Sequence, residues 1–463
     1  MDAMNDGGIF SLELTEIKKL IDNNDLTVCV IGIGRIGLPT ALSFAKSGLS
    51  TIGVDINEEL VNKIKNKDFP LKDEPGYQEI FEQVINSEKF TSTTKIEEAV
   101  ADSQIILLSL PTPMDKNNVP DYTALRTVGN QLKNLVKPGT IVIVESTIEP
   151  GFIENEFINL VENKDKKILA GESIGVGVCP ETANPGEIMK DFENLPRLVG
   201  ATDDKTSQII TKIYEHIFPV ELIPMPNCKT ANAVKLTTNV FRDVNIAFVN
   251  ELALLFEKLG IDIKTVLEAA DRKYNFQIHY PGAGVGGPCL PVNSYQMLNS
   301  AKAIDDNLLK IIKSGREINE HMPYHVVELT KDALNEAEKQ LDSSEILILG
   351  ISYKPNVKDI QLSPAEVIVS ELKKSGSNIR IFDPYFKNVS IYGIKTENDF
   401  EQIISQVDAV VIVTAHNEFE DISSEYFASK MKSPIVIDTR GIIDMHAAKK
   451  DGLIFRGLGR GRI

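Results

Sequence analysis

The feature that most constrains the fold is a glycine motif that follows an apolar run near the start of the chain. The run covers residues 28–31, and the chain continues as G-I-G-R-I-G-L-P. A segment with helical spacing follows at 39–47, and a second apolar run ends at Asp55. Strand, glycine turn, helix, strand and acid in this order are typical of a dinucleotide-binding Rossmann unit. The alternative is a glycine-rich turn in another α/β sheet.

The glycines and the acid each have a physical role in such a turn. Gly32 permits the tight turn, Gly34 lets a pyrophosphate approach the backbone, and Gly37 lets the helix pack on the strand. Asp55 would accept hydrogen bonds from the ribose hydroxyls and would repel a 2′-phosphate. We therefore expect NAD, rather than NADP, as the cofactor.

Length, charge and cysteine usage exclude several classes of protein. At 463 residues the chain is too long for one ordinary core, so more than one domain is expected. Its net charge of −17 argues against nucleic acid as a partner. A phosphorylated ligand is still permitted, because helix N-termini can bind one. No apolar run approaches the length of a membrane span, and residues 1–25 lack the pattern of a signal peptide. The four cysteines include no C-x-x-C pair, which predicts neither a metal site nor a disulfide framework and favours a reducing cytoplasm.

The rest of the chain continues the α/β rhythm, with one long helical interruption. Further strands are expected at 101–108, 140–144 and 174–179, a long helix at 230–259, a helical stretch at 304–341, and strands of a second α/β unit at 346–350, 379–383, 409–413 and 435–440. We predict two Rossmann-like doubly wound parallel-sheet domains joined by a central helical domain. The expected boundaries are an N-terminal extension at 1–25, an NAD-binding domain at 26–215, a central helical domain at 216–325 and a C-terminal α/β domain at 326–463.

A glycine- and proline-rich loop in the central region presents a single thiol. Residues 280–295 read Y-P-G-A-G-V-G-G-P-C-L-P-V-N-S-Y, with Cys289 as the cysteine. Glycines let the backbone turn and approach a ligand, and the flanking prolines stiffen the loop. A thiol on such a loop suits covalent catalysis. The alternative is a tight turn with a buried, inert cysteine.

Polar residues in two further places are candidates for the site. Thr112, Thr147 and Glu181 follow predicted strands, at the edge where parallel sheets bind ligands, although turn or capping residues also occur there. On the long helix, Lys235 and Asn239 share one face. Asn239, Arg242 and Asn245 interrupt an otherwise largely apolar pattern and call for polar partners, unless they form a solvated face. The same helix is a plausible oligomer surface.

Seven separated motifs in order resemble the UDP-glucose/GDP-mannose dehydrogenase family. They are G-I-G-R-I-G-L-P, E-S-T-I-E-P-G, C-P-E, K-L-T-T-N, G-V-G-G-P-C, Y-K-P-N-V and D-T-R-G, and the resemblance runs from about Thr27 to Leu458. It implies a dimer or larger homo-oligomer with a C-terminal domain that binds the UDP portion of a nucleotide sugar. Such enzymes oxidise the C6 hydroxyl to a carboxylate and reduce two NAD per turnover.

The resemblance also implies roles for individual residues. Cys289 would add to the intermediate aldehyde to give a thiohemiacetal, whose oxidation gives a thioester that water hydrolyses. The remaining catalytic residues would be Lys235 and Asn239 as oxyanion donors, Thr147 for the water and Glu181 as acid/base. Cofactor contacts would come from Gly32, Gly34, Arg35, Ile36, Asp55, Thr112 and Thr147. Substrate contacts would come from Lys235, Asn239, Arg242, Gly286, Lys354, Arg440 and Arg272. Of these, Lys354 and Arg440 would pair with the diphosphate, and Arg272 would reach a neighbouring subunit.

Some residues bear on the choice of substrate, and others depart from the family pattern. Pro185 and the segment 241–252 resemble the branch that acts on UDP-N-acetylhexosamines, so UDP-N-acetylmannosamine is our first expectation, with UDP-N-acetylglucosamine next and UDP-glucose as an alternative. Asn293 replaces the usual aspartate, Pro288 a common histidine, and Gln361 the usual arginine.

Two other hypotheses are a two-electron 3-hydroxyacid dehydrogenase, which leaves Cys289 unexplained, and a catalytically silent sugar-nucleotide binding protein, which Asn293 suggests.

Overall fold

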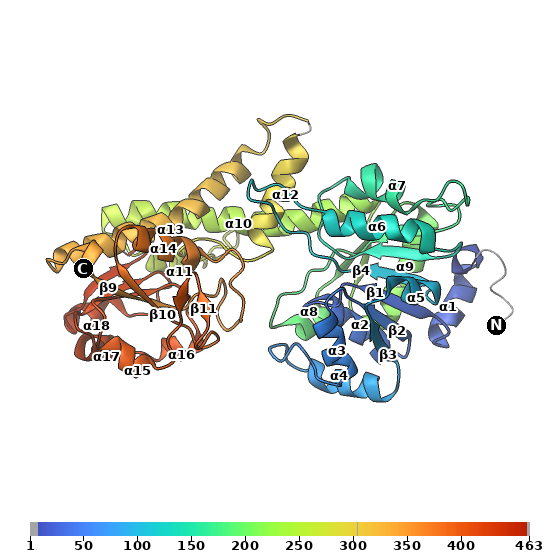
Figure 1. Cartoon of the computed structure of the whole chain (residues 1–463). Coiled ribbons are helices and arrows are strands. Elements are labelled where there is room, and N and C mark those ends of the chain that lie inside the picture. Colours follow the sequence, from blue (N-terminus) through green and yellow to red (C-terminus); the bar gives the residue numbers. More distant parts are fainter. Residues whose placement is uncertain (1–7, 303, 461–463) are drawn as a thin grey trace. The chain divides into compact units, whose positions relative to one another are not determined.

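The chain folds into two compact units. The structure is a computed structural model that describes residues 8–302 and 304–460. Unit 1 comprises Met1–Thr238 and Tyr295–Ile304, and unit 2 comprises Asn239–Ser294 and Asp305–Ile463. The division falls inside the helix α10 (Cys228–Leu259), which therefore contributes to both units (Figure 1). The bounds of the four predicted segments remain predictions, and residues 1–7 of the expected extension lie outside the described residues.

Unit 1 is built on an eight-stranded sheet in the order β3-β2-β1-β4-β5-β6-β7-β8. Its strands pair in parallel except at β6–β7, which is antiparallel. The strands are β1 (Thr27–Ile31), β2 (Ser50–Val54), β3 (Phe90–Thr93), β4 (Ile105–Leu108), β5 (Ile141–Val144), β6 (Gly175–Val178), β7 (Arg197–Ala201) and β8 (Leu222–Pro224). The helices of this part are α1 (Leu14–Asp22), α2 (Gly37–Lys46), α3 (Glu58–Lys65), α4 (Tyr77–Asn86), α5 (Ile96–Ala101), α6 (Thr123–Leu135), α7 (Ile158–Val161), α8 (Ile188–Asn194) and α9 (Asp204–Ile217).

Strand β1 shows why both faces of this sheet are covered. Val28 and Val30 belong to one buried apolar cluster, whereas Cys29 and Ile31 belong to a second. Because successive side chains of a strand point to opposite faces, an apolar run must be buried on both sides. Helices therefore pack on both faces, which is the doubly wound arrangement.

Unit 2 contains a smaller, fully parallel sheet in the order β10-β9-β13-β14-β15. Its strands are β9 (Glu345–Leu349), β10 (Asn378–Phe382), β13 (Ala409–Ile412), β14 (Ile435–Asp438) and β15 (Ile454–Gly457), with a short hairpin of β11 (Ser390–Ile391) and β12 (Ile394–Lys395). The helices are α11 (Ile263–Ala270), α13 (Lys310–Glu336), α14 (Pro364–Lys374), α15 (Phe400–Ile404), α16 (Asn417–Glu420), α17 (Ser424–Lys430) and α18 (Met445–Lys450). The helix α12 (Leu290–Lys302) begins in unit 2 and continues in unit 1 from Tyr295 on.

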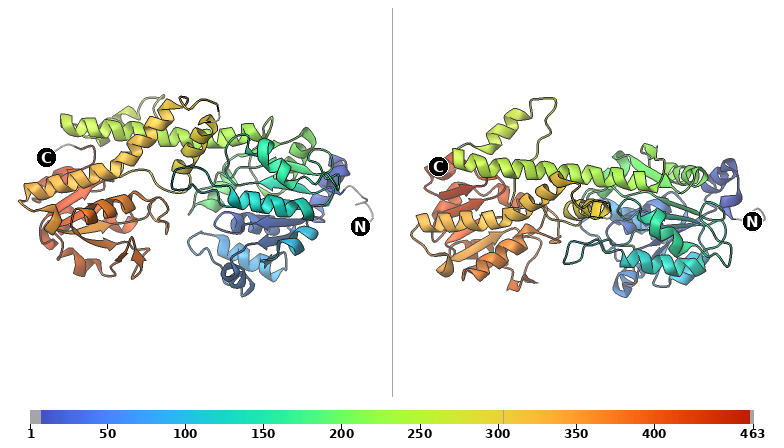
Figure 2. Two further views of the ribbon diagram at one scale, coloured as in Figure 1. Left: turned by 45° about the horizontal axis from the view of Figure 1, so that its top comes forward. Right: turned by 90° about the horizontal axis from the view of Figure 1, so that it is seen from above.

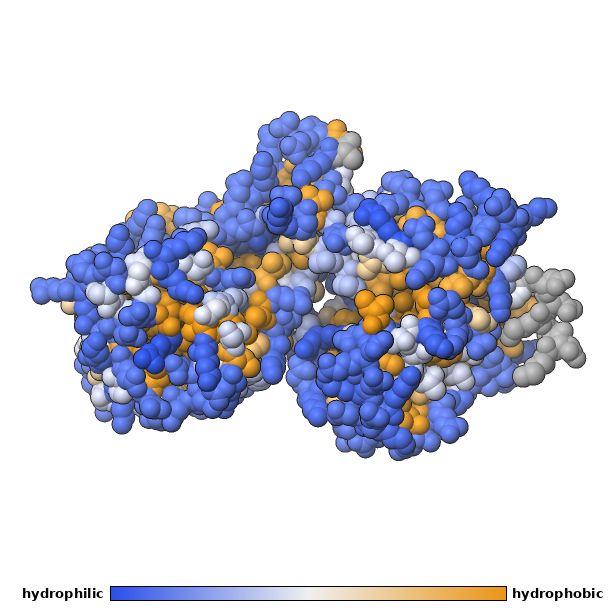
Figure 3. Space-filling model, viewed as in Figure 1, coloured by the Kyte–Doolittle hydropathy of each residue, from blue (hydrophilic) through white to orange (hydrophobic). Residues whose placement is uncertain are grey.

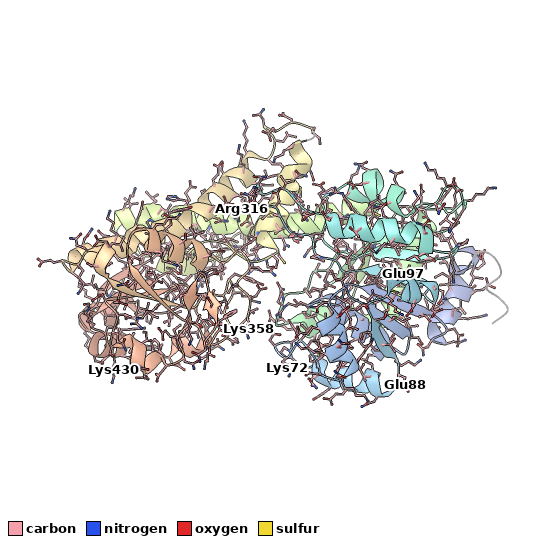
Figure 4. The ribbon with its side chains drawn as sticks, in the orientation of Figure 1. Lys72, Glu88, Glu97, Arg316, Lys358 and Lys430 are labelled. Atoms are coloured by element: carbon pink, nitrogen blue, oxygen red, sulfur yellow. The ribbon has the colours of Figure 1, made fainter. Side chains whose placement is uncertain are left out.

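A buried polar network joins α10 to α13 within unit 2, where the two helices lie side by side (Figure 2). Arg316, labelled in Figure 4, pairs with Asp243 at 2.9 Å. Asn319 donates to Asp243 at 2.8 Å and accepts a hydrogen bond of 2.9 Å from Asn250. Ser294, at the start of α12, donates to Asp243 at 2.6 Å. The network fixes the start of α12 against α10, and it therefore helps to position the cysteine loop that precedes α12.

The predicted fold class is confirmed, with differences at the edges of elements. The expected strand at 101–108 begins only at Ile105, because Ala101 ends α5, whose Ile96 and Val100 are buried. The edge strands β3, β8 and β15 and the internal strand β7 were not predicted. On the face shown in Figure 3, hydrophilic residues cover most of each unit. No helix among the described residues is long and apolar enough to cross a membrane.

Candidate active site

The turn after β1 has the geometry that the glycine motif predicts. Gly32 has a φ of +89°, and a Cβ at Gly37 would lie 1.8 Å from the Gly32 carbonyl oxygen, so both positions require glycine. A Cβ at Gly34 would meet nothing within 4 Å, which leaves open space at the backbone where a pyrophosphate would lie. Ile36 is the N-cap of α2, whose N-terminus favours negative charge. These residues fit a dinucleotide.

Asp55 lies directly after β2, beside this turn. Its Oδ2 accepts a hydrogen bond of 3.1 Å from the Ile33 backbone N–H, and its Oδ1 accepts one of 2.9 Å from Asn57. The carboxylate is partly exposed, so it can also accept from a ribose. Ile56, which follows, is 95% exposed and offers an apolar surface beside the acid. We did not predict Ile56, because an isolated isoleucine after a strand carries no sequence signal.

Arg35 pairs with two acids of the segment that precedes α4. Its Nη1 lies 2.9 Å from Asp73 and 3.1 Å from Glu74. Glu74 is buried and also accepts a hydrogen bond of 2.8 Å from the Gly186 backbone N–H. Burial raises the pKa of Glu74. Through Glu74, the glycine turn is connected to the loop that carries Glu181.

Thr112 and Thr147, which follow β4 and β5, lie together. The Thr112 hydroxyl donates to the Thr147 carbonyl at 2.9 Å. The Ser146 hydroxyl accepts from the Leu110 backbone N–H and donates to the Leu110 carbonyl, each at 2.8 Å. The ends of two neighbouring parallel strands are thereby joined at the edge where such sheets bind ligands.

Glu181, after β6, is part of a buried ion pair that sequence reasoning missed. Its Oε2 lies 2.9 Å from Nη1 of Arg197, and its Oε1 accepts from the backbone N–H groups of Thr182 and Ala183. The Arg197 guanidinium lies over the ring of Phe218, 3.8 Å from its centroid. An arginine at the first position of an apolar strand resembles an ordinary strand end, so no sequence pattern pointed to this pair.

Glu145 is the second buried carboxyl of this region. It is 1% exposed, and its Oε1 accepts a hydrogen bond of 2.6 Å from the hydroxyl of Tyr214. Burial, together with the nearby charge of Glu181, raises the pKa of Glu145 to about 7. A group whose pKa lies near 7 holds its proton for part of the time at neutral pH.

Cys289 differs from the other cysteines in its surroundings. It is exposed, whereas Cys29, Cys179 and Cys228 are buried. Burial raises the pKa of Cys29 and of Cys179 to about 12, so these thiols are inert at neutral pH. Cys289 lies immediately before α12, and its carbonyl accepts the hydrogen bond of 2.8 Å from Asn293 that opens the helix. A helix N-terminus stabilises the negative charge of a thiolate.

An amide pair lies next to the cysteine. Asn293, one turn after Cys289 on α12, is 3% exposed, and its Oδ1 accepts a hydrogen bond of 2.5 Å from the side chain of Asn239. An aspartate at 293 would accept the same bond, so the departure from the family pattern keeps this contact. Lys235 is 7% exposed and stands one turn before Asn239 on α10.

Unit 2 also contains a cavity lined by cationic side chains. It has a volume of about 210 Å³, and its lining includes Lys264, Tyr280, Arg440 and Arg460. Arg440 Nε donates to the Val413 carbonyl at 2.6 Å, and the described part of the chain gives Arg440 no ion pair. Burial lowers the pKa of Arg440 to about 10, so the side chain is still a cation at neutral pH. A half-buried cation without a salt-bridge partner suits an anionic ligand.

Four predicted substrate residues lie elsewhere in unit 2. Arg242 and Arg272 are exposed, and so neither needs a polar partner within its unit. In the part of α10 that belongs to unit 2, the buried polar side chains are Asp243 and Asn250. Lys354 lies on the loop between β9 and α14, beside the turn that contains Gly286. Within the described ranges, no group of three or more His, Cys, Asp or Glu side chains is placed to hold a metal ion.

A dinucleotide turn on one Rossmann-like sheet, a second such sheet and an exposed thiol at a helix N-terminus define an NAD-dependent oxidoreductase. Patterns of the UDP-glucose/GDP-mannose dehydrogenase family match the chain three times: the NAD binding domain at residues 26–218, the central domain at 229–321 and the UDP binding domain at 347–445. The chain belongs to this family of nucleotide-sugar dehydrogenases, and its cofactor is NAD.

Named relatives and solved structures resemble the chain over nearly its whole length. UDP-N-acetyl-D-mannosamine dehydrogenase of Methanocaldococcus jannaschii is 34% identical over 441 residues, which cover 94% of this chain and 97% of the relative. The structure of the Pyrococcus horikoshii UDP-D-ManNAc dehydrogenase has a TM-score of 0.87 at 33% identity and covers 95% of this chain and 100% of its own. That of UDP-N-acetyl-mannosamine dehydrogenase Cap5O of Staphylococcus aureus has a TM-score of 0.78 at 30% identity, covering 94% and 98%.

Proposed function

We propose that this protein oxidises the C6 hydroxyl of a UDP-N-acetylhexosamine to the carboxylate, with UDP-N-acetylmannosamine as the first choice of sugar. The observation that carries the mechanism is the place of Cys289, which is exposed at the N-terminus of α12 while the other cysteines are buried. The choice of sugar is supported by the names of the relatives.

The chemistry explains why a thiol is needed. Oxidation of an alcohol to an acid removes two hydrides and passes through an aldehyde, which would escape if it were free. The Cys289 thiolate adds to the aldehyde carbon, and a second hydride leaves the resulting thiohemiacetal. Water then attacks the thioester and supplies the second carboxylate oxygen, and the Cys289 thiolate is released. NAD, when bound, accepts the hydride of each oxidation.

The remaining residues support these steps by binding and by proton transfer. Asn239 is oriented by Asn293 and donates to the developing oxyanion, with Lys235 as the cation one turn away on α10. Glu181, held by Arg197, is the acid/base of thioester hydrolysis. Thr147, fixed by Thr112 and α12, orients the water.

The cationic cavity of unit 2 is the proposed place of the UDP portion. Arg440 and Arg460 lie at its lining, and Lys354 on the β9–α14 loop supplies a further cation for the diphosphate. A Cβ at Gly282 would lie 2.5 Å from Nη1 of Arg440, so glycine at this position leaves room for the guanidinium. The family's UDP binding pattern covers residues 347–445, which include Lys354 and Arg440.

We also propose a homodimer or larger assembly through α10, in the cytoplasm. Large apolar residues recur on this helix at seven-residue spacing and are exposed: Val234, Phe241, Phe248 and Leu255, with Leu259 one turn further. A helix stripe of this kind suits burial against the same stripe of a second copy. The cysteines form no disulfide, which suits a reducing compartment.

Replacement of the thiol tests the proposed mechanism. Cys289→Ser keeps the size of the side chain but loses a good nucleophile and leaving group, so we expect uronic acid formation to fall at least about a thousandfold while UDP still binds. Cys228→Ser, at a buried cysteine, is the matched control and should retain activity. Acid formation at near wild-type rate by Cys289→Ser would contradict the mechanism. UDP-sugar binding by the wild type without any NADH formation would favour a silent binding protein.

A further inference from the structure

The turn that precedes Cys289 rests on the loop between β9 and α14, which we call the 350–363 loop. The Gly287 backbone N–H donates to the Gln361 carbonyl at 2.9 Å. Gly287 has a φ of +87°, and a Cβ there would lie 2.7 Å from the ring of Tyr353. The Tyr353 ring therefore packs directly against the backbone two residues before the nucleophile.

Gly286 shows that the contact extends along the turn. A Cβ at Gly286 would lie 2.4 Å from the Leu362 carbonyl oxygen and 3.0 Å from Cβ of Tyr353. Two consecutive glycines thus let the turn approach both ends of the 350–363 loop. If the Tyr353 ring moves, the turn must move with it, because the two are closely packed and no space lies between them.

The 350–363 loop is itself anchored at the carboxyl edge of the unit 2 sheet. Asp383 accepts a hydrogen bond of 2.8 Å from the Ile351 backbone N–H. His416, which is fully buried, accepts one of 3.0 Å at Nδ1 from Asn356 and contacts Asp383 through Nε2 at 3.1 Å. Ile351 and Asn356 therefore anchor the loop to the edge of the sheet. Tyr353 and Gln361 of the same loop contact the turn. Lys358, labelled in Figure 4, lies between Tyr353 and Gln361 in sequence.

We propose that the 350–363 loop couples nucleotide binding to the orientation of Cys289, with Tyr353 as the positioning residue. The proposal rests on the proposed function, because it takes Lys354 as a diphosphate contact and Cys289 as the nucleophile. Lys354 is the neighbour of Tyr353, so a diphosphate that fixes Lys354 also fixes the Tyr353 ring against Gly287. The turn then holds the Cys289 thiol at the N-terminus of α12, where the thiolate is stabilised.

Alkylation of Cys289 gives a readout that does not depend on turnover. Cys289 is the exposed cysteine and the other three are buried, so iodoacetamide should react at this position first. UDP is the probe, because it carries the diphosphate but lacks the hexose that must reach the thiol in the reaction. In the wild type we expect saturating UDP to raise the alkylation rate about threefold, the scale of modest coupling between linked sites.

Variants at Tyr353 separate positioning from binding. Tyr353→Phe keeps the ring, and so it should retain the threefold effect of UDP. Tyr353→Ala removes the ring; we expect UDP to bind by calorimetry within about threefold of wild type but to leave the alkylation rate unchanged. Gln361→Ala is the matched control in the same loop: it keeps the backbone carbonyl that accepts the hydrogen bond from Gly287, so it should retain the threefold effect of UDP. Melting temperatures close to wild type would show that both tyrosine variants are folded.

The outcomes also distinguish this proposal from the proposed function. A wild type that binds UDP with no change in alkylation rate overturns the coupling and leaves the proposed function intact. An equal UDP effect in wild type and Tyr353→Ala overturns the role of Tyr353. A wild type that binds no UDP overturns the nucleotide site of the proposed function, and the coupling with it.

Discussion

Glu181 and Arg197 form an ion pair inside the NAD-binding unit, with Oε2 and Nη1 2.9 Å apart and side-chain exposures of 8% and 2%. The guanidinium is enclosed by the rings of Phe218 and Phe192, at 3.8 and 4.4 Å from its carbon to their centroids. Coulombic attraction to Glu181 raises the pKa of Arg197 against the cost of burial. The proposed acid/base of the reaction is therefore oriented by a charge that water does not screen.

Removal of this arginine should cost more stability than removal of the pair. Arg197→Met leaves the Glu181 carboxylate buried without its counter-charge, so we expect the free energy of unfolding to fall by about 3 to 5 kcal/mol. The double variant Arg197→Met/Glu181→Gln should recover most of that loss. Chemical denaturation of the three proteins measures both values. Equal stability of Arg197→Met and the wild type would show that the pair is not structurally important.

Glu145 should make stability depend on pH. Its pKa is raised from 4.5 to about 7 in the folded protein. Between these values the unfolded chain has released the proton that the folded protein still binds, so stability falls as pH rises through this window and is constant above it. The glutamine of Glu145→Gln is neutral at every pH, so this variant avoids the free-energy cost of a buried carboxylate above pH 7. That cost is on the order of 3 kcal/mol.

The matching experiment compares melting temperatures across pH. We expect the Glu145→Gln protein to melt close to wild type near pH 5 and about 5 °C or more above it at pH 8. Glu97→Gln, at an exposed position on α5, is the control for a general loss of negative charge. A difference between Glu145→Gln and wild type that stays constant from pH 5 to pH 8 would refute the raised pKa.

The amide pair beside the thiol predicts a graded series at position 293. Asn293→Asp keeps an acceptor for the Asn239 amide, so we expect kcat within about threefold of wild type. Asn293→Ala leaves the Asn239 donor without this partner, and kcat should fall about tenfold with the KM for the nucleotide sugar little changed. Steady-state kinetics of both variants measures kcat and KM. Equal kcat for Asn293→Ala and the wild type would remove the pair from the mechanism.

The sequence predicted those parts of the site that depend on local pattern. The glycine turn and Asp55 follow from spacing along one strand–turn–helix unit, and the exposed Cys289 follows from a loop too rich in glycine and proline to pack as core. Contacts between distant segments carried no such signal. Arg197 meets Glu181 because the antiparallel pairing of β6 and β7 brings the start of β7 beside the segment that follows β6. Tyr353 meets Gly287 through packing between segments that are 66 residues apart in the chain.

The short edge strands illustrate the same limit at the level of the fold. β8 covers Leu222–Pro224 and is only partly buried, so it lacks the continuous apolar run that marks β1 or β5. Its place beside β7 comes from pairing, which periodicity does not report. Conversely, the long helix over 230–259 was recognisable because its apolar spacing extends over many turns, as α10 confirms.

The apolar stripe of α10 predicts the oligomeric state. Phe248→Glu places a charge in the middle of the proposed contact, so we expect the assembly to dissociate at micromolar concentration, as measured by analytical ultracentrifugation. Lys331→Glu, at an exposed position on α13, is the control and should leave the mass unchanged. An assembly of unchanged mass in Phe248→Glu, or a monomeric wild type, would contradict an interface through α10.

The most direct test of the account is the number of NADH molecules formed per nucleotide sugar consumed. Purified protein with excess NAD would be given a limiting amount of UDP-N-acetylmannosamine, UDP-N-acetylglucosamine or UDP-glucose, with NADH followed by absorbance and the sugar product by mass spectrometry. We predict two NADH and one uronic acid per UDP-N-acetylmannosamine, with slower reaction of the other two sugars. One NADH per sugar with an accumulating aldehyde would contradict a four-electron oxidation through Cys289.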